Sequence, residues 1–408
     1  MRNMLFTAVA TLSILSVAFL LPSSSRQEEA KLLSDVGAEL RLVACCATSA
    51  RTSSLRNTQL VSNIINALPE DVHVLLIVND RAAFVKSGKD RRVTFVEMPT
   101  DSDMSIWPQD PFVVVQSETS TRLVTPCSFE REDDERIPRQ LAKLLQLDLV
   151  HSELQFEGGN IVCGADEVLM GFDTIQQNVD LLEISADEVQ QRFELLFGRQ
   201  VLIVGDAPQS VAHIDLVVTP LSQGRVAVAD SRAGAQLAAE ALSQDSRQVE
   251  EFERQCEQEF FGQAGVVKLL DRDGNTIESP PVVGQTASTI DASMNLAPEL
   301  DAIAKQLAAA GYQVVRIPAL IPDQQLPVDE QGDVMPQYPF LSYCNILTET
   351  RQNRSIAYVP QYGFDKLDRD ARRAWEALGY QVRTIKGFAT SAMYGGALRC
   401  CTKVLLRD

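Results

Sequence analysis

The sequence predicts an α/β fold, a five-fold pseudosymmetric α/β propeller of repeated ββαβ-type units. The clearest support is a repeat in the sequence. Residues 300–318 and 371–387 each combine an amphipathic helix with a Gly-Tyr-Gln-Val segment that opens a β-branched strand. Gly311 and Gly379 stand where a helix C-terminal cap is expected. Self-similarity in a fixed order is typical of propellers and other repeat architectures.

The same order of elements can be followed through the rest of the chain, which gives five repeats. Each repeat is expected to contain a strand, a helix, a second strand and a last strand. The first strands are expected near 42, 123, 168–171, 226–229 and 356–359, and the last strands at 112–115, 160–163, 214–219, 343–347 and 401–406. Residues 234–295 fit no repeat and are expected to form an insertion.

Composition and charge limit the class of protein. The chain has 408 residues, of which 45% are hydrophobic and 23% charged, as in an ordinary globular protein. Its formal net charge of −18 is opposite to what a nucleic-acid binder needs to neutralise phosphates. We therefore expect no nucleic-acid partner, whereas an acidic surface tolerates cationic ligands.

The N-terminus predicts export. Arg2 precedes an uncharged run at 4–21, and Pro22 and three serines follow this run. This pattern predicts a secretory signal at 1–25 in a periplasmic or secreted protein. The run is long for a signal and short for a free-standing membrane span, so the alternative is an uncleaved anchor that attaches the chain to the membrane through residues 4–21. Residues 26–37 are expected to be a linker, and 38–408 a single catalytic domain.

The cysteines and histidines predict no metal site. Eight cysteines are present, and two pairs are adjacent, Cys45-Cys46 and Cys400-Cys401. No CxxC motif or Cys/His cluster indicates zinc. The segment that starts at Asp271 lacks the sixth-position glycine of a calcium loop, so a hairpin turn is favoured there.

Unusual polar residues gather at one place in each repeat, the loop before the last strand or the start of that strand. Equivalent positions of a closed ring converge at its central axis, so five such clusters predict a functional site. Taken alone, each cluster would more often be a turn or a buried core position. The clusters are Trp107-Pro-Gln-Asp110, Glu157-Gly-Gly-Asn160, His213-Ile-Asp215, Ser342-Tyr-Cys-Asn345 and Gly395-Gly-Ala-Leu-Arg-Cys400.

These residue types favour chemistry on a guanidinium group. A cysteine such as Cys400 is a good nucleophile once it is a thiolate, and His213 can carry protons. Asp110 and Asp215 offer planar carboxylates that suit the fork of N–H donors of a guanidinium. Two carboxylates beside a thiolate would raise its pKa in a protease, whereas a cationic substrate stabilises the thiolate.

The motifs resemble those of the pentein superfamily of guanidine-modifying enzymes, which includes arginine, agmatine and peptidylarginine deiminases and amidinotransferases. The resemblance covers residues from about 40 to 408, except for the insertion. Gln109 before the aspartate is closer to the peptidylarginine deiminases, and the motif from Ser342 to Asn345 is similar to that of agmatine-type members. Arg399 precedes the predicted nucleophile, and arginine deiminases also have an arginine there. Cys401, which follows the nucleophile, departs from the family's pattern.

The resemblance implies a covalent deimination without metal or organic cofactor. Asp110 and Asp215 would hold the guanidinium, and Cys400 would attack its carbon. His213 would protonate the departing ammonia and then activate water, which leaves a ureido product. The further substrate-binding residues implied are Trp107, Glu157, Asn160, Asn345 and Arg399.

Three other functions remain open at this stage. An amidinotransferase would pass the same intermediate to an amine, and a pseudoenzyme would only bind guanidines. An unrelated exported cysteine hydrolase is disfavoured by the two aspartates. The expected substrate is a small guanidine or an arginine-containing peptide or protein.

Overall fold

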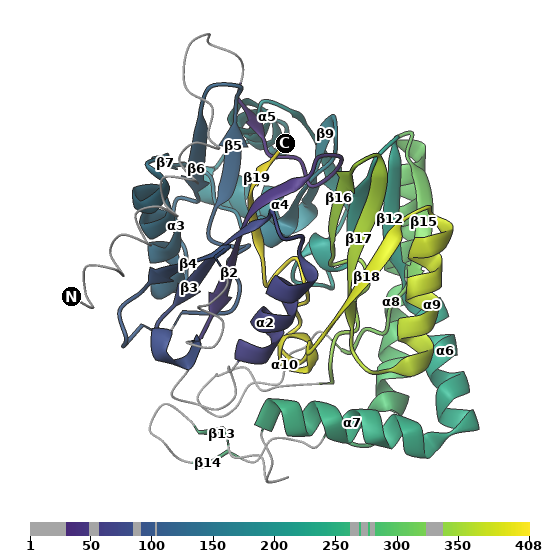
Figure 1. The fold of residues 1–408 in the computed structure, drawn as a ribbon. Helices are drawn as coiled ribbons and strands as arrows, with labels where there is room; N and C mark the ends of the chain where they lie inside the picture. The colour runs from purple at the N-terminus through teal and green to yellow at the C-terminus, as the bar shows by residue number, and fades with distance from the viewer. Residues whose placement is uncertain are drawn as a thin grey trace, which may run out of the picture. The chain divides into compact units, whose positions relative to one another are not determined.

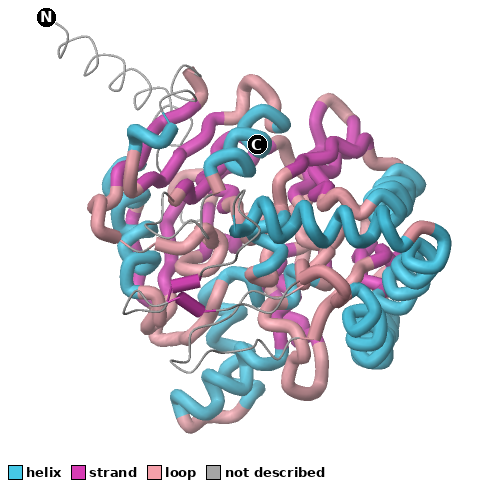
Figure 2. Tube along the Cα trace, turned by 90° about the horizontal axis from the view of Figure 1, so that it is seen from below, coloured by secondary structure: helices cyan, strands magenta, loops and turns pink. Residues whose placement is uncertain are grey.

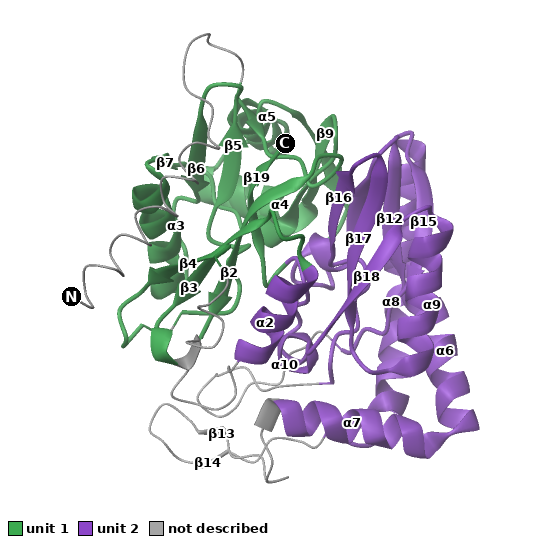
Figure 3. Ribbon diagram, in the orientation of Figure 1, with its two compact units in different colours: residues 1–48, 68–208, 400–408 green, residues 49–67, 209–399 purple. Residues whose placement is uncertain are grey.

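The computed structural model describes residues 30–48, 57–84, 91–102, 104–261, 269–270, 276–277, 282–323 and 338–408. The chain divides into two compact units, each built from separate stretches of sequence (Figure 3). Unit 1 contains residues 1–48, 68–208 and 400–408, and unit 2 contains 49–67 and 209–399. The expected signal at 1–25, and the alternative anchor at 4–21, lie outside the described residues. No helix among the described residues is long and apolar enough to cross a membrane.

Five sheets share one topology, in which two antiparallel strands are followed, after helical residues, by a strand parallel to the second (Figure 1). The predicted ββαβ order is therefore confirmed. The sheets of unit 1 are β5 (Val113–Gln116), β6 (Thr121–Thr125) and β7 (Asp148–His151); β8 (Ile161–Cys163), β9 (Glu167–Gly171) and β10 (Gln200–Val204); and β19 (Lys403–Arg407), β2 (Leu40–Ala47), β3 (His73–Val78) and β4 (Val93–Glu97). The sheets of unit 2 are β11 (Val218–Leu221), β12 (Arg225–Asp230) and β15 (Gln313–Pro318); and β16 (Leu347–Arg351), β17 (Arg354–Gln361) and β18 (Gln381–Lys386).

The structure corrects how the strands group into repeats. The strand predicted to end each repeat instead pairs with the first strand of the next repeat, as β5 pairs with β6. The reason is the short connection between the two, which favours an antiparallel hairpin, whereas the parallel neighbour needs a long crossover. Between β16 and β17 the turn is only Gln352 and Asn353, both with positive φ (50° and 60°). The last strand of the chain, β19, pairs with β2.

Helices alternate with these strands along the chain (Figure 2). Those of the repeats are α2 (Thr58–Ala67), α3 (Glu132–Leu145), α4 (Phe172–Leu182), α5 (Ala186–Phe197) and α9 (Asp365–Ala377), and the short α10 (Ala389–Met393) comes before β19. The predicted insertion at 234–295 is largely helical. It contains most of α6 (Ser231–Gln244), α7 (Ser246–Phe261) and the start of α8 (Thr286–Ala309).

α8 continues without a break through residue 295, near which the insertion was predicted to end. α8 packs on α6 and on strands β12 and β15, so both helices belong to the helical layer of this repeat. The turn predicted after residue 270 is supported by the hairpin of β13 (Leu269–Leu270) and β14 (Thr276–Ile277). Residues 271–275 themselves lie outside the described residues.

The stretch expected to be a linker is structured from residue 30 onward. β1 (Lys31–Leu32) pairs antiparallel with β5 and extends that sheet. Leu32 is 4% exposed and belongs to a hydrophobic cluster of unit 1. The segment is therefore part of unit 1, because the side chain of Leu32 is buried there.

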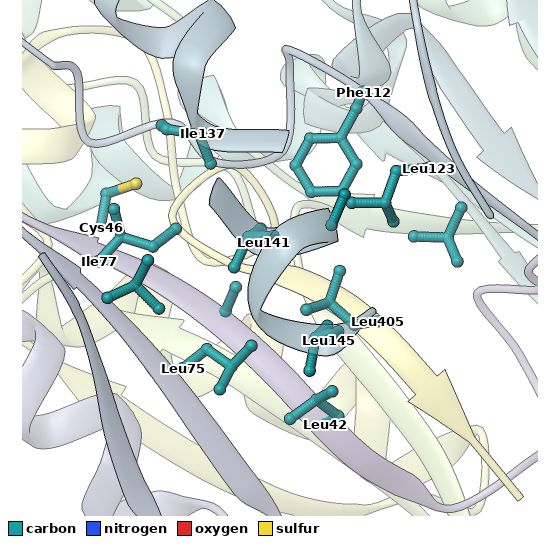
Figure 4. Close-up of a cluster of buried hydrophobic side chains, with 14 of the residues drawn as sticks. Leu42, Cys46, Leu75, Ile77, Phe112, Leu123, Ile137, Leu141, Leu145 and Leu405 are labelled. Carbon is teal, nitrogen blue, oxygen red and sulfur yellow. The ribbon is translucent and has the colours of Figure 1, made fainter. Parts of the chain in front are cut away.

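A second cluster of unit 1 shows why these elements hold together (Figure 4). Ile137, Leu141 and Leu145 recur every four residues on α3 and are buried against β2 and β3. Leu75 on β3 contributes to the same cluster. Burying one such side chain contributes about 1.5–3 kcal/mol. The cluster thus joins α3, which packs on β6 and β7, to side chains of β2, β3 and β19.

Candidate active site

Two of the predicted polar motifs of unit 1 are hydrogen-bonded to each other. Gln109 Nε2 donates to the carbonyl oxygen of Gly158 at 3.0 Å, and Gly158 N donates to the carbonyl oxygen of Asp110 at 2.9 Å. A Cβ at Gly158 would lie 2.0 Å from the Gln109 carbonyl oxygen, so this position requires glycine. The loop 107–110 before β5 and the short 3-10 helix Gly158–Asn160 before β8 therefore form one rigid element.

Asp110 is 3% exposed and is paired with an arginine. Arg131 donates from NH2 to Asp110 Oδ2 at 3.0 Å, and from Nε to Asp134 Oδ2 at 2.7 Å. Asp134 is fully buried, and its other oxygen accepts from Ser105 N at 2.7 Å. Burial lowers the pKa of Arg131, but the charges of Asp110 and Asp134 outweigh it and raise that pKa above its usual value.

Lys403 connects the Asp110 loop to the segment that carries Cys400. Its side chain is buried on β19, three residues after Cys400. Nζ donates to the carbonyl oxygens of Gln109, at 3.1 Å, and Phe112, and it lies 4.8 Å from the centroid of the Phe112 ring. Lys403 therefore holds both flanks of Asp110 against the strand that follows the predicted nucleophile.

Cys400 and Cys401 lie in a turn before β19, and both are buried. The sequence predicted a strand at 401–406, but β19 begins at Lys403. Trp107 and Glu157 are partly exposed, whereas Asn160 is buried. All of these residues belong to unit 1.

In unit 2, Asp215 is the centre of a second buried cluster. Arg399 NH1 donates to Asp215 Oδ2 at 2.8 Å, and Asn345 Nδ2 donates to the Asp215 carbonyl oxygen at 3.3 Å. Asp215 is fully buried, and Arg399 is 8% exposed. The partly exposed His213 directly precedes the 3-10 helix Ile214–Leu216 that carries Asp215.

Ser342 explains the shape of the motif that ends at Asn345. Its hydroxyl accepts hydrogen bonds from Cys344 N at 3.2 Å and Asn345 N at 3.1 Å. The same hydroxyl donates to the carbonyl oxygen of Leu216. This serine turn therefore places Asn345 against the segment of Asp215.

The predicted site residues fall into two sets. Arg399 is the last residue of unit 2, and Cys400, the next residue in the chain, belongs to unit 1. The set of unit 1 is Trp107, Asp110, Glu157, Asn160 and Cys400, and the set of unit 2 is His213, Asp215, Asn345 and Arg399.

No sequence motif indicated Arg131, Asp134 or Lys403 as functional residues. Arg131 and Asp134 stand in an acidic stretch that is typical of a solvated helix start. Lys403 directly precedes the short apolar run 404–406 near the end of the chain, and lysines are usually exposed. Their partners lie 21, 29 and 294 residues away in the chain. Such contacts depend on the tertiary fold.

A family model of Porphyromonas-type peptidyl-arginine deiminases matches residues 46–269, more than half of the chain. The chain belongs to this family. No curated protein matches it. The predicted resemblance to the pentein superfamily is therefore confirmed, and the family is one of enzymes that act on guanidino groups.

Solved structures show that this peptidyl-arginine deiminase family member has the fold of agmatine deiminases. The agmatine deiminase of C. jejuni is similar over 94% of this chain and 99% of its own, with a TM-score of 0.60 and 14% identity. The agmatine deiminase of Enterococcus faecalis is similar over 94% and 98%, with a TM-score of 0.61 and 15% identity. The predicted α/β fold is confirmed by these matches.

Other buried cysteines of this peptidyl-arginine deiminase family member are poor nucleophiles. Burial raises the pKa of Cys45 to about 12, and it likewise raises that of Cys344 to about 12. Burial also holds the pKa of Cys46 well above its usual value. Thiols of this kind stay protonated near neutral pH, so none of the three fits the role predicted for Cys400.

Proposed function

We propose that this chain is a guanidine deiminase that hydrolyses the guanidinium group of an arginine-type substrate to a ureido group and ammonia. The proposed nucleophile is Cys400, and the intermediate is a covalent thiouronium. Peptidyl arginine is the proposed form of the substrate, because the family model that matches the chain is that of peptidyl-arginine deiminases.

The observation that carries this proposal is the pairing of both predicted aspartates with arginine. Asp110 accepts from Arg131 at 3.0 Å and Asp215 accepts from Arg399 at 2.8 Å. An arginine guanidinium is the same chemical group as the proposed substrate. Each carboxylate is therefore placed to accept hydrogen bonds from a guanidinium, and substrate binding must displace the chain's own arginine or share the carboxylate with it.

Chain connectivity supports a common role for the two clusters. Arg399, which pairs with Asp215, is bonded directly to Cys400, and consecutive Cα atoms are about 3.8 Å apart. Lys403 links the same segment to the loop of Asp110. The proposed nucleophile thus follows one guanidinium-binding cluster in the chain and precedes the residue that supports the other.

The proposed reaction has two balanced steps. The Cys400 thiolate attacks the guanidinium carbon and a C–S bond forms. The C–N bond then breaks, and His213 donates the proton that the departing ammonia needs. His213 next removes a proton from water, whose oxygen bonds to the same carbon as the C–S bond breaks. The ureido product leaves, and the thiolate is restored.

The remaining site residues are proposed to bind the substrate. Trp107 is partly exposed and suits contact with the substrate's alkyl stem or cationic face. Glu157, Asn160 and Asn345 would supply polar contacts. The uncharged run at 4–21 supports export or membrane anchoring, either of which places the enzyme where it meets peptides and proteins.

Turnover by the purified chain tests the proposal. The substrates are arginine, agmatine, methylated arginine and a blocked arginine peptide, and the readout is the ureido product. Cys400→Ser is expected to lower turnover by about 10³-fold or more, because it removes the covalent route. Cys401→Ser is the matched control and is expected to keep turnover close to that of the unchanged chain.

The outcomes separate the competing functions. A folded chain without turnover on any substrate would contradict deimination, and guanidine binding without turnover would indicate a pseudoenzyme. Transfer of the amidino group to an added amine, in preference to water, would indicate an amidinotransferase. Equal loss in Cys400→Ser and Cys401→Ser would contradict the assignment of Cys400.

A further inference from the structure

A cleft lies in unit 1, away from the candidate active-site residues. It has a volume of about 540 Å³, which is within the range of about 300–1,000 Å³ found for small-molecule sites. Asp110 precedes β5 and Cys400 precedes β19, whereas the cleft is lined by Gln116 and Arg407 at the far ends of these strands. Its position therefore separates it from the chemistry proposed above.

Positive charge sets this cleft apart from the rest of an acidic chain. Lys31, Arg199 and Arg407 line it, and Glu118 is the one carboxylate among the described residues that do so. The whole chain carries a net charge of −18. No described carboxylate lies within ion-pair distance of Lys31 or Arg199. The cleft thus favours an anion in a protein that otherwise repels anions.

The arginines of the cleft are held in place by backbone carbonyls. Arg407 is 7% exposed and donates from NH1 to the Ala38 carbonyl oxygen at 3.1 Å. Arg199 donates from Nε to the Leu32 carbonyl oxygen at 3.1 Å, and from NH1 to the carbonyl oxygen of Ala165. For Arg199, neutral carbonyls fix the guanidinium without cancelling its charge. Both arginines are held in place by the fold, which preorganises the cleft for an anionic ligand.

The wall formed by residues 30–33 is closely packed. Gly198 has φ 59°, and a Cβ there would lie 2.3 Å from the Ala30 carbonyl oxygen. Lys31 pairs with Gln116 across β1 and β5, which fixes the backbone that carries its side chain. The described backbone on both sides of the cleft is therefore fixed.

We propose that this cleft binds a small organic anion that carries a carboxylate or phosphate group on an apolar body. Lys31, Arg199 and Arg407 would bind the charged group, with a further hydrogen bond from the Ser117 hydroxyl. Leu33, Val36 and Ala38 also line the cleft and would contact the apolar body. The site does not depend on the proposed deimination.

Isothermal titration calorimetry on the full chain at low ionic strength tests this site. The probes are phenyl phosphate, inorganic phosphate and the neutral benzyl alcohol. Phenyl phosphate is expected to bind best, inorganic phosphate more weakly, and benzyl alcohol without measurable heat. Equal binding of all three, or no binding of phenyl phosphate, would overturn the proposal.

Substitutions in both directions sharpen the test. Lys31→Gln and Arg199→Gln are expected to weaken phenyl phosphate binding by fivefold or more. Glu118→Gln is expected to strengthen it at least twofold, a gain that misfolding cannot produce. Lys31 and Glu118 are exposed, so their substitutions leave the packing of the fold unchanged.

Controls distinguish the cleft from overall charge and from the active site. Arg192→Gln lowers the net charge by as much as Lys31→Gln does, and Glu70→Gln raises it by as much as Glu118→Gln does. Both positions are exposed or partly exposed and lie outside the cleft, so these variants are expected to leave phenyl phosphate binding unchanged. Arg131→Gln is also expected to leave it unchanged. Binding that follows Arg192 or Arg131 rather than Lys31 and Glu118 would contradict the assignment of this cleft.

Discussion

The loop that carries Asp110 is fixed by buried charged groups from distant segments. Asp134 binds the start of the loop at Ser105 N, and through Arg131 it also orients the Asp110 carboxylate. Lys403 holds the carbonyl oxygens on either side of that aspartate. A carboxylate that must meet a planar guanidinium benefits from such support, because small misplacements strongly weaken catalysis.

Lys403→Met should therefore reduce catalysis, although Lys403 is not proposed to contact the substrate. Methionine keeps much of the apolar volume but removes the donor to two buried carbonyl oxygens, and an unsatisfied buried group costs about 1–3 kcal/mol. We expect kcat/KM to fall by about tenfold or more, which is the change expected if this free energy is lost from the stabilisation of the transition state. Lys403→Arg should restore part of the loss, and the exposed Lys143→Met should have no effect.

Asp134→Asn tests the second support of the same loop. The amide can still accept from Ser105 N, but it cannot pair with the Arg131 guanidinium. We expect the free energy of unfolding to fall by about 1.5–3 kcal/mol, the usual value of a hydrogen bond to a charged group. KM should rise together with this loss. Asp133→Asn is the control, because Asp133 pairs with Arg136 near the surface, and it should change stability by less than about 1 kcal/mol.

The nine candidate site residues could be proposed from the sequence because each belongs to a motif of polar residues placed before a predicted strand. The supporting residues were not, because a lone arginine or lysine has no local signature of burial. Arg131 resembles a surface residue until Asp134 and Asp110 are placed around it. Sequence reasoning therefore predicted candidate chemistry but not what holds one of its carboxylates in place.

At the scale of elements, α3 depends on one apolar stripe. Leu141 is fully buried in the cluster between α3 and the sheet of β2 and β3. Leu141→Ala should lower the free energy of unfolding by about 2–5 kcal/mol, because it removes buried methyl groups and leaves a cavity. Chemical denaturation measures this change. Leu195→Ala on α5 is the control, since Leu195 is 82% exposed and its loss should cost less than about 0.5 kcal/mol.

An ion-pair network in unit 2 makes the attachment of α8 depend on pH. Asp301 on α8 pairs with Arg316 on β15 at 2.7 Å and with Arg232 on α6 at 3.1 Å. The hydrogen bond from Arg316 is the main reason why the pKa of Asp301 is lowered. A lowered pKa contributes stability above the unfolded-state pKa of about 3.9, and this contribution is lost as pH falls through the folded-state pKa.

Thermal unfolding at neutral and acidic pH can detect this contribution. The unchanged chain should lose more stability than Asp301→Asn when the pH is lowered below 4, because only the former loses the Asp301 charge. The two proteins should converge at the acidic end. An equal loss in both would show that this carboxylate does not contribute to acid sensitivity.

Most strands were predicted within a few residues, but two were not, and the grouping was incorrect. The strand predicted at 343–347 begins only at Leu347, and the one predicted at 214–219 starts with the 3-10 helix Ile214–Leu216 before β11 begins at Val218. The order of strands and helices repeats along the chain, so a shift by one strand gives an equally regular pattern. Pairing between β5 and β6, which decides the question, depends on backbone hydrogen bonds that no side-chain pattern displays. The helix α8 was also predicted too short, because its start at Thr286 precedes the part with a clear amphipathic repeat.

At the scale of the whole molecule, the last strand of the described chain pairs with one of its first strands. β19 pairs with β2, and Asp408 N donates to the Glu39 carbonyl oxygen at 3.1 Å. The C-terminal strand thus completes the sheet of the first repeat. Residues as far apart in the chain as Glu39 and Asp408 are therefore neighbours in this sheet.

A circular permutant tests this closure. It would start at Asn353, run to Asp408, continue through a short glycine-rich linker to Ala30 and end at Gln352. The new ends lie in the two-residue turn between β16 and β17, whose residues are exposed, so the cut breaks no sheet pairing in mid-strand. We expect the permutant to fold cooperatively and to keep its ureido-forming activity. A permutant opened inside β12, between the buried Ala227 and Val228, should fail to fold because the cut divides a paired central strand. If the first permutant also fails, the covalent order of the repeats matters for folding in addition to their pairing.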